Sequence, residues 1–174
     1  MMKKITGVLD KSARRRLKAG EEVLYSGVIY TARDQAHKRL VRAIEAGRRL
    51  PIGLRDAIIY YCGPTPSPRK RRVGSAGPTT SARMDPFTPL LIKKGLGGMI
   101  GKGRRSPEVR RAIRKYGAVY FLAIGGAGAY LAEKITTADK IAYKELGAEA
   151  LYRFRVKDFP LIVGIDARGH DVYR

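Results

Sequence analysis

The sequence of 174 residues contains one cysteine, Cys62, and no tryptophan. A single cysteine cannot form an internal disulfide, and it cannot supply the cysteine ligands of an iron–sulfur cluster or of a thiolate-bound metal. Without tryptophan, and without an RNP motif or zinc-finger spacing, the sequence offers no clear platform for stacking bases. These absences exclude a disulfide framework or a cysteine-held cluster built within this chain, and we expect no metal ligands in it.

Long apolar runs are also absent. No run approaches the ~20 residues that a membrane-spanning helix needs. The first ten residues, MMKKITGVLD, lack the apolar stretch of a secretory signal. We therefore expect a cytoplasmic protein without a membrane partner. With 44% hydrophobic residues, the chain is long enough for a single domain, residues 1–174, around a well-packed core.

Acidic residues are few, because 15 Asp and Glu stand against 36 Lys and Arg, for a formal net charge of +21. The basic residues include short clusters at 14–16, 48–49, 69–72, 104–105 and 110–111. A nucleic-acid backbone, an acidic membrane surface, or small anionic substrates together with an acidic subunit could each use such charge. A solvated basic surface is the simplest interpretation, and charge alone does not decide among these partners.

Hydrophobic periodicity and turn residues predict interleaved strands and helices. Strands are expected at 21–30, 56–64, 97–103, 118–124, 140–146 and 150–160, and a last strand segment at 161–173 with a hairpin turn at 167–169. Helices are expected at 31–49, 84–95, 106–117 and 125–135. Thr31 and Asp34 have capping-box spacing, Asp85 and Pro86 fit a helix start, and Gly117 fits a helix end. The sum is a mixed α/β domain.

A segment rich in Pro, Gly, Ser and Arg, residues 64–78, separates two of these apolar regions. Loops this long without structure of their own are uncommon in compact domains and are usually functional or disordered. We therefore predict a flexible loop at 64–78.

The stretch from Thr79 to Asp85 is a candidate anion site. It offers two hydroxyls, Thr79 and Thr80, one cation, Arg83, and backbone N–H groups near the expected start of a helix. Helix N-termini and such turns stabilise carboxylates and phosphates, and arginine binds a carboxylate with two parallel hydrogen bonds. A turn followed by a helix cap explains the same residues without any ligand.

Two further stretches carry cations near strand ends. Arg33 and His37 lie four residues apart and share the apolar face of the expected helix, which turns both inward. A buried arginine needs an anion, which is either Asp34, another acidic side chain or a bound carboxylate. His37 has the simpler interpretation of a satisfied histidine at the edge of the core. Lys102 lies between two glycines after an apolar strand, where a second anion contact is plausible.

Four ordered motifs carry a resemblance to a known family. YTARDQAHKRL, GPTTSARMD, MIGKG and IGGAGAYLA follow one another at suitable distances. Together they resemble the β subunit, or fused C-terminal domain, of the class I fumarate hydratases and the related L-tartrate dehydratases, from about Ser26 to the C-terminus. The resemblance implies a swivelling β/β/α fold and an iron–sulfur hydro-lyase. In that family a separate α subunit or N-terminal domain holds a [4Fe–4S] cluster through three cysteines, in agreement with the lone Cys62.

The resemblance also implies roles for single residues. The family's carboxylate-binding cations match Arg33, Arg83 and Lys102. Thr79 matches a residue proposed to act in proton abstraction, although threonine is a poor base unless a neighbour takes its proton. The supporting neighbours are Asp34, His37 and Thr80. Fixed cations at both ends of a dicarboxylate would orient it as well as bind it.

We therefore expect the β subunit of a two-subunit hydro-lyase that interconverts fumarate and (S)-malate and is inactive without its α subunit. The expected partners are that α subunit, in a hetero-oligomer, and the dicarboxylate. The alternative is the same architecture acting on L-tartrate or a mesaconate-type diacid. A basic RNA-binding module is a further alternative, and it predicts steeply salt-dependent RNA binding that survives the loss of Arg33 and Arg83.

Overall fold

The computed structural model describes residues 1–67 and 73–174. In chain order the elements are β1 (Lys3–Thr6), α1 (Lys11–Arg15), β2 (Glu22–Thr31), α2 (Asp34–Glu45), β3 (Ile58–Tyr60), the 3₁₀ turn η1 (Ser81–Met84), α3 (Thr88–Lys93), β4 (Gly98–Gly101), α4 (Pro107–Tyr116), β5 (Val119–Leu122), α5 (Gly128–Glu133), β6 (Ile135–Ala142), the 3₁₀ segment η2 (Lys144–Glu149) and β7 (Leu151–Ile165). No helix among these elements is both long and apolar enough to cross a membrane.

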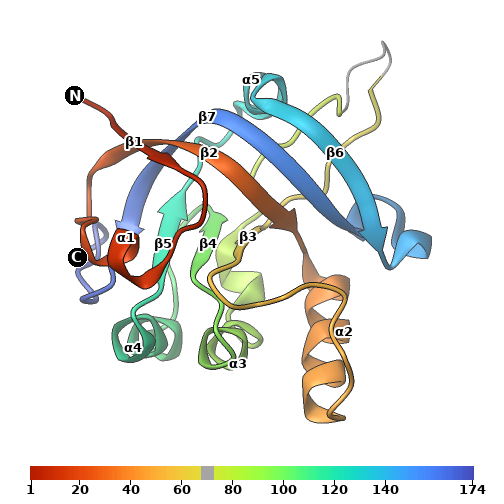
Figure 1. The fold of residues 1–174 in the computed structure, drawn as a ribbon, viewed down its shortest axis with the longest axis horizontal. Coiled ribbons are helices and arrows are strands. Elements are labelled where there is room, and N and C mark those ends of the chain that lie inside the picture. The colour runs from red at the N-terminus through yellow and green to blue at the C-terminus, as the bar shows by residue number, and fades with distance from the viewer. Residues whose placement is uncertain (68–72) are drawn as a thin grey trace.

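The seven described strands form one sheet that closes on itself (Figure 1). β2, β3, β4 and β5 pair in parallel in that order. The long strand β7 then pairs antiparallel with both β5 and β2 and completes the ring. β1 lies beside β2, and β6 lies beside β7. Closure pairs both edges of the central strands, so their backbone hydrogen bonds are satisfied within the sheet.

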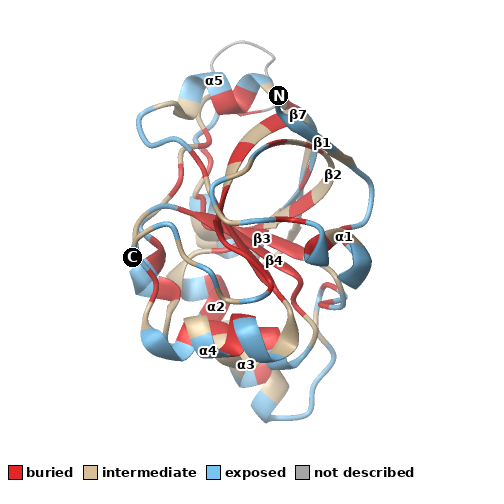
Figure 2. Cartoon of the chain, turned by 90° about the vertical axis from the view of Figure 1, so that its left-hand side faces the viewer, coloured by how far each residue is buried: buried red, intermediate tan, exposed pale blue. Residues whose placement is uncertain are grey.

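Three helices cover one outer face of this sheet. Figure 2 shows α2, α3 and α4 on one side of β3 and β4, with β2 and β7 arching over the other side. The order of layers is therefore sheet, sheet and helix. The expected mixed α/β domain is confirmed, and its layering agrees with a β/β/α architecture.

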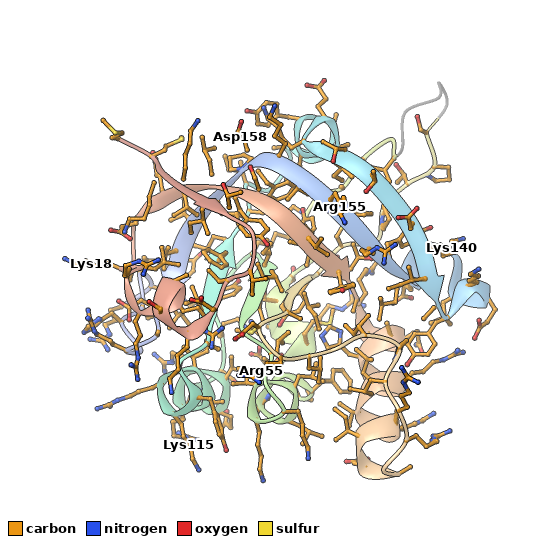
Figure 3. The ribbon with its side chains drawn as sticks, viewed as in Figure 1. Lys18, Arg55, Lys115, Lys140, Arg155 and Asp158 are labelled. Carbon is orange, nitrogen blue, oxygen red and sulfur yellow. The ribbon has the colours of Figure 1, made fainter. Side chains whose placement is uncertain are left out.

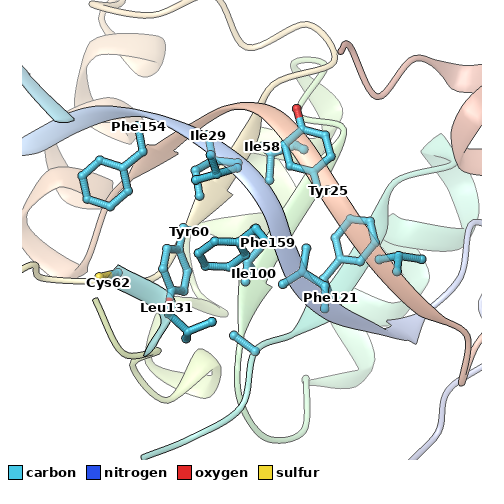
Figure 4. Close-up of a cluster of buried hydrophobic side chains, with 14 of the residues drawn as sticks. Tyr25, Ile29, Ile58, Tyr60, Cys62, Ile100, Phe121, Leu131, Phe154 and Phe159 are labelled. Carbon is cyan, nitrogen blue, oxygen red and sulfur yellow. The ribbon is translucent and has the colours of Figure 1, made fainter. Parts of the chain in front are cut away.

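Alternate residues of the central strands pack into two separate hydrophobic cores. Ile58 and Tyr60 point into the barrel, where they pack with Phe159 and other buried side chains (Figure 4). Ile59 and Tyr61 point the other way and pack against the helices. This alternation is the period of two that a strand imposes on its side chains. An apolar run such as 58–62 is therefore buried on both of its faces.

Several expected elements are confirmed, and α4 has both predicted ends. The Ser106 hydroxyl accepts a hydrogen bond from the Val109 N–H (3.2 Å), and Gly117 ends the helix with φ +71°. The turn at 167–169 is also present, with the Gly169 N–H donating to the Asp166 carbonyl (2.9 Å). β1 and α1 were not predicted, since both are short and largely exposed.

The predicted start of the helix at 31–49 is wrong. Thr31 is the last residue of β2, and its hydroxyl accepts a hydrogen bond from the Tyr152 N–H (3.2 Å) rather than capping a helix. α2 begins at Asp34, with Arg33 in the N-cap position and no side-chain cap. Because β2 pairs with β7, the Thr31 hydroxyl is bonded to Tyr152 and cannot cap the helix.

The predicted start of the helix at 84–95 is also wrong. A 3₁₀ turn ends at Met84, and α3 begins only at Thr88. The Asp85 carboxylate caps no helix here, because its two oxygens accept hydrogen bonds from Arg105 Nε (2.7 Å) and the Ser106 N–H (2.8 Å). A long-range ion pair therefore replaces the local cap.

The expected strands in the last third are divided differently. The segments 150–160 and 161–173 were predicted as separate strands, whereas β7 continues through Pro160, which lies opposite Leu24 in β2. The strand expected at 140–146 lies earlier, as β6, and is followed by η2. Strand pairing with β2, β5 and β6 along its length holds β7 together across a residue usually typical of strand ends.

The predicted flexible loop at 64–78 is described only at its two ends. Thr65 and Ser75 form an antiparallel bridge, and the Ala76 N–H donates to the Gly128 carbonyl (3.0 Å). Both ends are therefore tied to the domain. The cluster at 69–72 and the centre of this loop lie outside the described residues, so flexibility there stays a prediction.

Candidate functional site

The site is built at the carboxyl ends of β2, β3 and β4. These strands are parallel neighbours, so the segments that leave them meet at one edge of the sheet. Arg33 follows β2, Gly63 follows β3, and Lys102 follows β4. The topology thus brings together residues that are up to about 70 positions apart in the sequence.

The segment that contains Thr79 and Thr80 is tied to this edge by backbone hydrogen bonds. The Thr79 N–H donates to the Tyr61 carbonyl (2.7 Å), and the Ser81 N–H donates to the Lys102 carbonyl (3.0 Å). Thr80 and Lys102 form a parallel bridge. These bonds place both threonines beside the end of β4. They also occupy two of the N–H groups that the sequence suggested for an anion, and α3 begins only at Thr88, so the predicted cradle of free N–H groups is wrong in that respect.

Gly101 allows this close approach. A Cβ atom at Gly101 would lie 1.9 Å from the Ser81 hydroxyl oxygen and 2.8 Å from the Tyr61 ring. Real Cβ contacts are never so short. The end of β4 must therefore be glycine for the Thr79–Ser81 segment to lie against it.

Arg33 is a cation without a counter-ion in the described part of the chain. Its side chain runs along Gly63, where an added Cβ would lie 3.0 Å from Arg33 Nη1. Its Nε atom is buried and has no hydrogen-bond partner. Asp34, the neighbour that could have neutralised it, pairs with Arg83 Nη2 instead (2.8 Å). An unpaired, partly buried guanidinium beside an open edge is what an anion-binding site requires.

Arg83 and Lys102 complete the set of cations. The ion pair with Asp34 brings Arg83 next to Arg33, and 53% of the Arg83 side chain remains exposed. Lys102 is exposed, makes no ion pair among the described residues, and its side chain reaches the backbone of Gly125. The Thr79 hydroxyl likewise has no intramolecular hydrogen bond in the described part of the chain. The structure therefore groups the predicted residues and leaves several of their polar atoms available.

His37 lies beneath this group, within the helix-side core. Its Nδ1–H donates to the Arg33 carbonyl (2.8 Å), and its ring lies against Tyr61 and Phe87. Burial, together with the positive charge of Arg105, lowers the pKa of His37 to about 4. His37 is therefore neutral near pH 7. The expected inward orientation is confirmed, but the Nε2 atom is buried without a partner, so this histidine is not fully satisfied.

A buried polar network behind the site was missed by sequence reasoning. Arg105 is 5% exposed and bonds to Asp85 (2.7 Å), to the Thr88 hydroxyl (2.9 Å) and to the Tyr61 hydroxyl (3.1 Å). Burial alone would lower the pKa of Arg105, but the Tyr61 hydroxyl and the Asp85 carboxylate outweigh it and the net direction is upward. The only sequence signal was the position of Arg105 two residues after the end of the MIGKG motif.

The expectation that the basic clusters are solvated is wrong for two of their members. Arg105 is one, and Arg14 is the other, at 6% exposed. Arg14 donates to the Gly117 carbonyl (2.8 Å) and pairs with Asp56 (2.6 Å). Both side chains join separate elements, so they belong to the scaffold rather than to a binding surface.

Cys62 lies inside the barrel, away from solvent. Burial raises the pKa of its thiol to about 12, against the nearby charge of Arg33. A neutral, enclosed thiol is a poor metal ligand. Among residues 1–67 and 73–174, no group of three or more His, Cys, Asp or Glu side chains could hold a metal ion.

The sequence of this chain is similar to those of several known proteins. A class I anaerobic fumarate hydratase of Escherichia coli is 42% identical over 152 residues, which cover 86% of this chain and 28% of that protein. Fumarate hydratase 1, mitochondrial, of Leishmania major is 41% identical over 151 residues, or 85% of this chain and 27% of that protein. A Methanocaldococcus jannaschii protein provisionally named L(+)-tartrate dehydratase subunit beta is 37% identical over 175 residues, or 95% of this chain and 88% of that protein.

The extent of these matches limits what they show. The chain spans little more than a quarter of the length of the fumarate hydratases it matches, but most of the length of the tartrate dehydratase relative. The model of the family described as "Fumarase C-terminus" matches residues 5–174. With the motif residues gathered at one edge and nearly the whole chain matched, this protein belongs to the fumarase C-terminus family.

Proposed function

We propose that this chain is the β subunit of an iron–sulfur hydro-lyase and binds the carboxylates of its substrate, with fumarate and (S)-malate as the pair interconverted. One observation carries the proposal: Arg33 has a buried Nε atom with no partner and no counter-ion among the described residues, at the same carboxyl edge of the sheet as Lys102 and Thr79. The names of the relatives, which are fumarate hydratases and a tartrate dehydratase subunit, support the same reaction class.

The chemistry of a dicarboxylate fits three cations at one edge. Each carboxylate can take a bidentate pair of hydrogen bonds from a guanidinium, and an ammonium adds a point charge. Arg33 is positioned by the turn into α2, and Lys102 by the bridge to Thr80. A substrate held by fixed cations loses less entropy when it reaches the reactive orientation, because binding has already oriented it. Asp34 would have to share Arg83 with the substrate, since it pairs with Arg83 in the structure.

Thr79 is the proposed residue for proton transfer at the carbon next to a carboxylate. Elimination of water from malate takes a proton from one carbon and the hydroxyl from its neighbour. The Thr79 Oγ atom can accept that carbon-bound proton only after losing its own, because a neutral hydroxyl is a weak base. The positive charges of Lys102 and Arg33 at the same edge would favour the deprotonated oxygen and the charge that develops on the substrate.

The cluster is proposed to reside on an α subunit rather than here. The fit is poor in this chain, because its one thiol is buried and neutral and no group of ligating side chains in residues 1–67 and 73–174 substitutes for three cysteines. On its own subunit, a [4Fe–4S] cluster would supply a Lewis-acidic iron for the substrate hydroxyl. The two subunits would form a hetero-oligomer in the cytoplasm, with this edge facing the partner.

An exposed apolar side chain supports a partner at this edge. Ile124 follows β5 at the same carboxyl end as Lys102 and is 55% exposed. The next residue, Gly125, lies against the Lys102 side chain. One exposed aliphatic side chain is ordinary on a protein surface, but a subunit that covered this edge would remove Ile124 from water.

The test is activity of the two-subunit enzyme. This chain would be produced together with an α chain that carries three cysteines and purified without oxygen, and kcat and KM for (S)-malate would be measured. Arg33→Gln and Lys102→Gln should each lower kcat/KM at least about 10-fold, from the loss of a charged hydrogen bond. Thr79→Ala should lower kcat more than it raises KM.

The matched control is Lys115→Gln, which removes one charge from α4, on the far side of the domain from this edge (Figure 3). This variant should keep the wild-type constants. Wild-type kcat/KM in both Arg33→Gln and Lys102→Gln would refute the carboxylate-binding role. The ratio of kcat/KM for (S)-malate and L-tartrate decides between the two substrate classes, and a ratio favouring tartrate or a methylated diacid selects the alternative.

A further inference from the structure

A basic hollow lies at the other end of α2, away from the candidate site. Its volume is about 750 Å³, and it is lined by the second half of α2, by the segment that follows the helix, and by a residue preceding η2. The lining residues that matter here are Arg39, Arg42, Arg48, Arg49, Leu50 and Tyr143. Arg48 and Arg49 form one of the sequence clusters to which the proposed function gives no role.

The charge of this hollow is not balanced by the described residues. Arg39 pairs with Glu145, but no ion pair is present in the described part of the chain for Arg42, Arg48 or Arg49. No acidic side chain is part of the lining. Arginine residues that line one space without ion-pair partners repel one another, so the arrangement favours a ligand with several negative charges.

One wall of the hollow is aromatic. The Arg39 guanidinium lies 5.2 Å from the centre of the Tyr143 ring. Tyr143 has φ +55°, a left-handed backbone that is unusual for an aromatic residue. The Tyr143 ring therefore lies against Arg39 although the backbone at Tyr143 is strained. Leu50 adds apolar surface to the same hollow. A ligand with an anionic part and a flat apolar part would use both kinds of lining.

The hollow is separate from the carboxylate site. Arg42 is nine residues beyond Arg33, which is roughly 14 Å along a helix. A four-carbon diacid cannot reach both. A single guanidinium can bind a phosphate group with two parallel hydrogen bonds. A space of this size accommodates a nucleotide. We propose that the hollow binds a polyphosphate ligand of the nucleoside diphosphate or triphosphate class. This inference does not depend on the proposed function.

The test uses the full chain and measures binding of ATP and of inorganic triphosphate by calorimetry. We expect saturable 1:1 binding of ATP. The double variant Arg42→Gln/Arg48→Gln should weaken it about 100-fold or more, from two charged contacts at about 10-fold each. Tyr143→Leu should weaken ATP binding but leave triphosphate binding unchanged, which separates recognition of the nucleoside from recognition of phosphate.

The control is Arg111→Gln/Lys115→Gln, which removes the same charge from the exposed face of α4. It should retain wild-type affinity for both probes. Equal losses in the two double variants would show a non-specific charge effect and overturn the proposal. The proposal also fails if ATP binding does not saturate, or if a single-stranded RNA binds through Arg42 and Arg48 and excludes ATP at equimolar concentration.

Discussion

Arg33 and His37 lie one helical turn apart. Arg33 is a cation that needs a counter-ion, whereas His37 is buried in its neutral form. Arg33 keeps its charge and lacks a counter-ion among the described residues, so it is suited to hold a ligand. His37 is completely enclosed and donates its one N–H to the Arg33 carbonyl, so it helps to fix the backbone that carries Arg33. In the proposed carboxylate site His37 would therefore act as a positioning residue for Arg33. Because its ring is buried, protonation of His37 should lower the stability of the domain.

The pH dependence of stability should report His37. Its pKa is about 4 in the folded chain and near 6.5 when unfolded, so between these values only the unfolded chain takes up the proton. The free energy of unfolding should therefore fall as pH drops from 6.5 to 4, by up to about 3 kcal/mol from this group. Urea unfolding at several pH values would measure it, with His37→Gln as the comparison. The same slope in both proteins would contradict this prediction.

The elements around the site are held together by a few close approaches of backbone. β4 ends at Gly101, against the Ser81 and Tyr61 side chains, and the Thr79–Ser81 segment bonds to the residues after β3 and β4. The start of α3 at Thr88 lies seven residues beyond Ser81, and the segment that meets the end of β4 leads instead into the 3₁₀ turn η1. The geometry of the hydroxyl and cation groups therefore depends on how tightly one turn packs on one strand end.

Gly101→Ala should disrupt that junction. The added methyl group would overlap the Ser81 hydroxyl and the Tyr61 ring, and overpacking of this kind costs about 1–3 kcal/mol of unfolding free energy. In the proposed two-subunit enzyme, the KM for the diacid should rise as well, because Lys102 and Thr79 would shift apart. Urea unfolding and steady-state kinetics would test both effects.

The matched control for that substitution is Gly53→Ala. A Cβ atom at Gly53 meets nothing within 4 Å, and its φ lies outside the left-handed region. Its stability should stay within about 0.5 kcal/mol of the wild type. If Gly101→Ala behaved like this control, the close packing at the end of β4 would not matter for the site.

At the scale of the whole molecule, Arg105 joins elements that are remote in sequence. It lies between the rings of Tyr61 and Tyr120, at 5.1 and 4.8 Å from their centres, and bonds to Asp85 and Thr88. The Tyr120 hydroxyl in turn lies 2.8 Å from the Ser81 hydroxyl. The network therefore couples β3, β5, α3 and the turn that carries Thr79. Its charge is buried, which makes the pairing indispensable rather than merely favourable.

Asp85→Asn should be one of the most damaging isosteric changes in the chain. It leaves the Arg105 charge buried without its partner, a loss of about 3–5 kcal/mol in unfolding free energy. Arg105→Met combined with Asp85→Asn should recover part of this loss, since no buried charge remains. Arg111→Gln, which breaks a solvent-exposed pair with Glu108, should leave the free energy of unfolding almost unchanged. Chemical denaturation of the variants would measure the three values, and a loss below 1 kcal/mol for Asp85→Asn would disprove the role of the network.

Sequence reasoning succeeded where local rules decide the outcome. The apolar runs at 58–62 and 118–122 became buried parallel strands, and the helix at 106–117 kept its serine and glycine ends, because each depends only on neighbouring residues. The motifs also named Arg33, Thr79, Arg83 and Lys102 as candidate site residues, and their roles stay predictions. Pairing between distant residues was outside the reach of those rules. Asp85 and Thr31 look like helix caps locally, yet tertiary partners take their oxygen atoms.

The sequence by itself determined a basic, mixed α/β domain of the fumarase C-terminus family, with its cations placed just beyond strand ends. Periodicity, turn chemistry and motifs are properties of short segments, so they can be recognised from the sequence without the structure. Only the tertiary structure decided that Asp34 neutralises Arg83 and leaves Arg33 unpaired, and that Arg105 is scaffold while Arg42 and Arg48 face an open hollow. Whether a charge is buried, paired or free depends on which elements the closed sheet brings against it, and no local pattern records that.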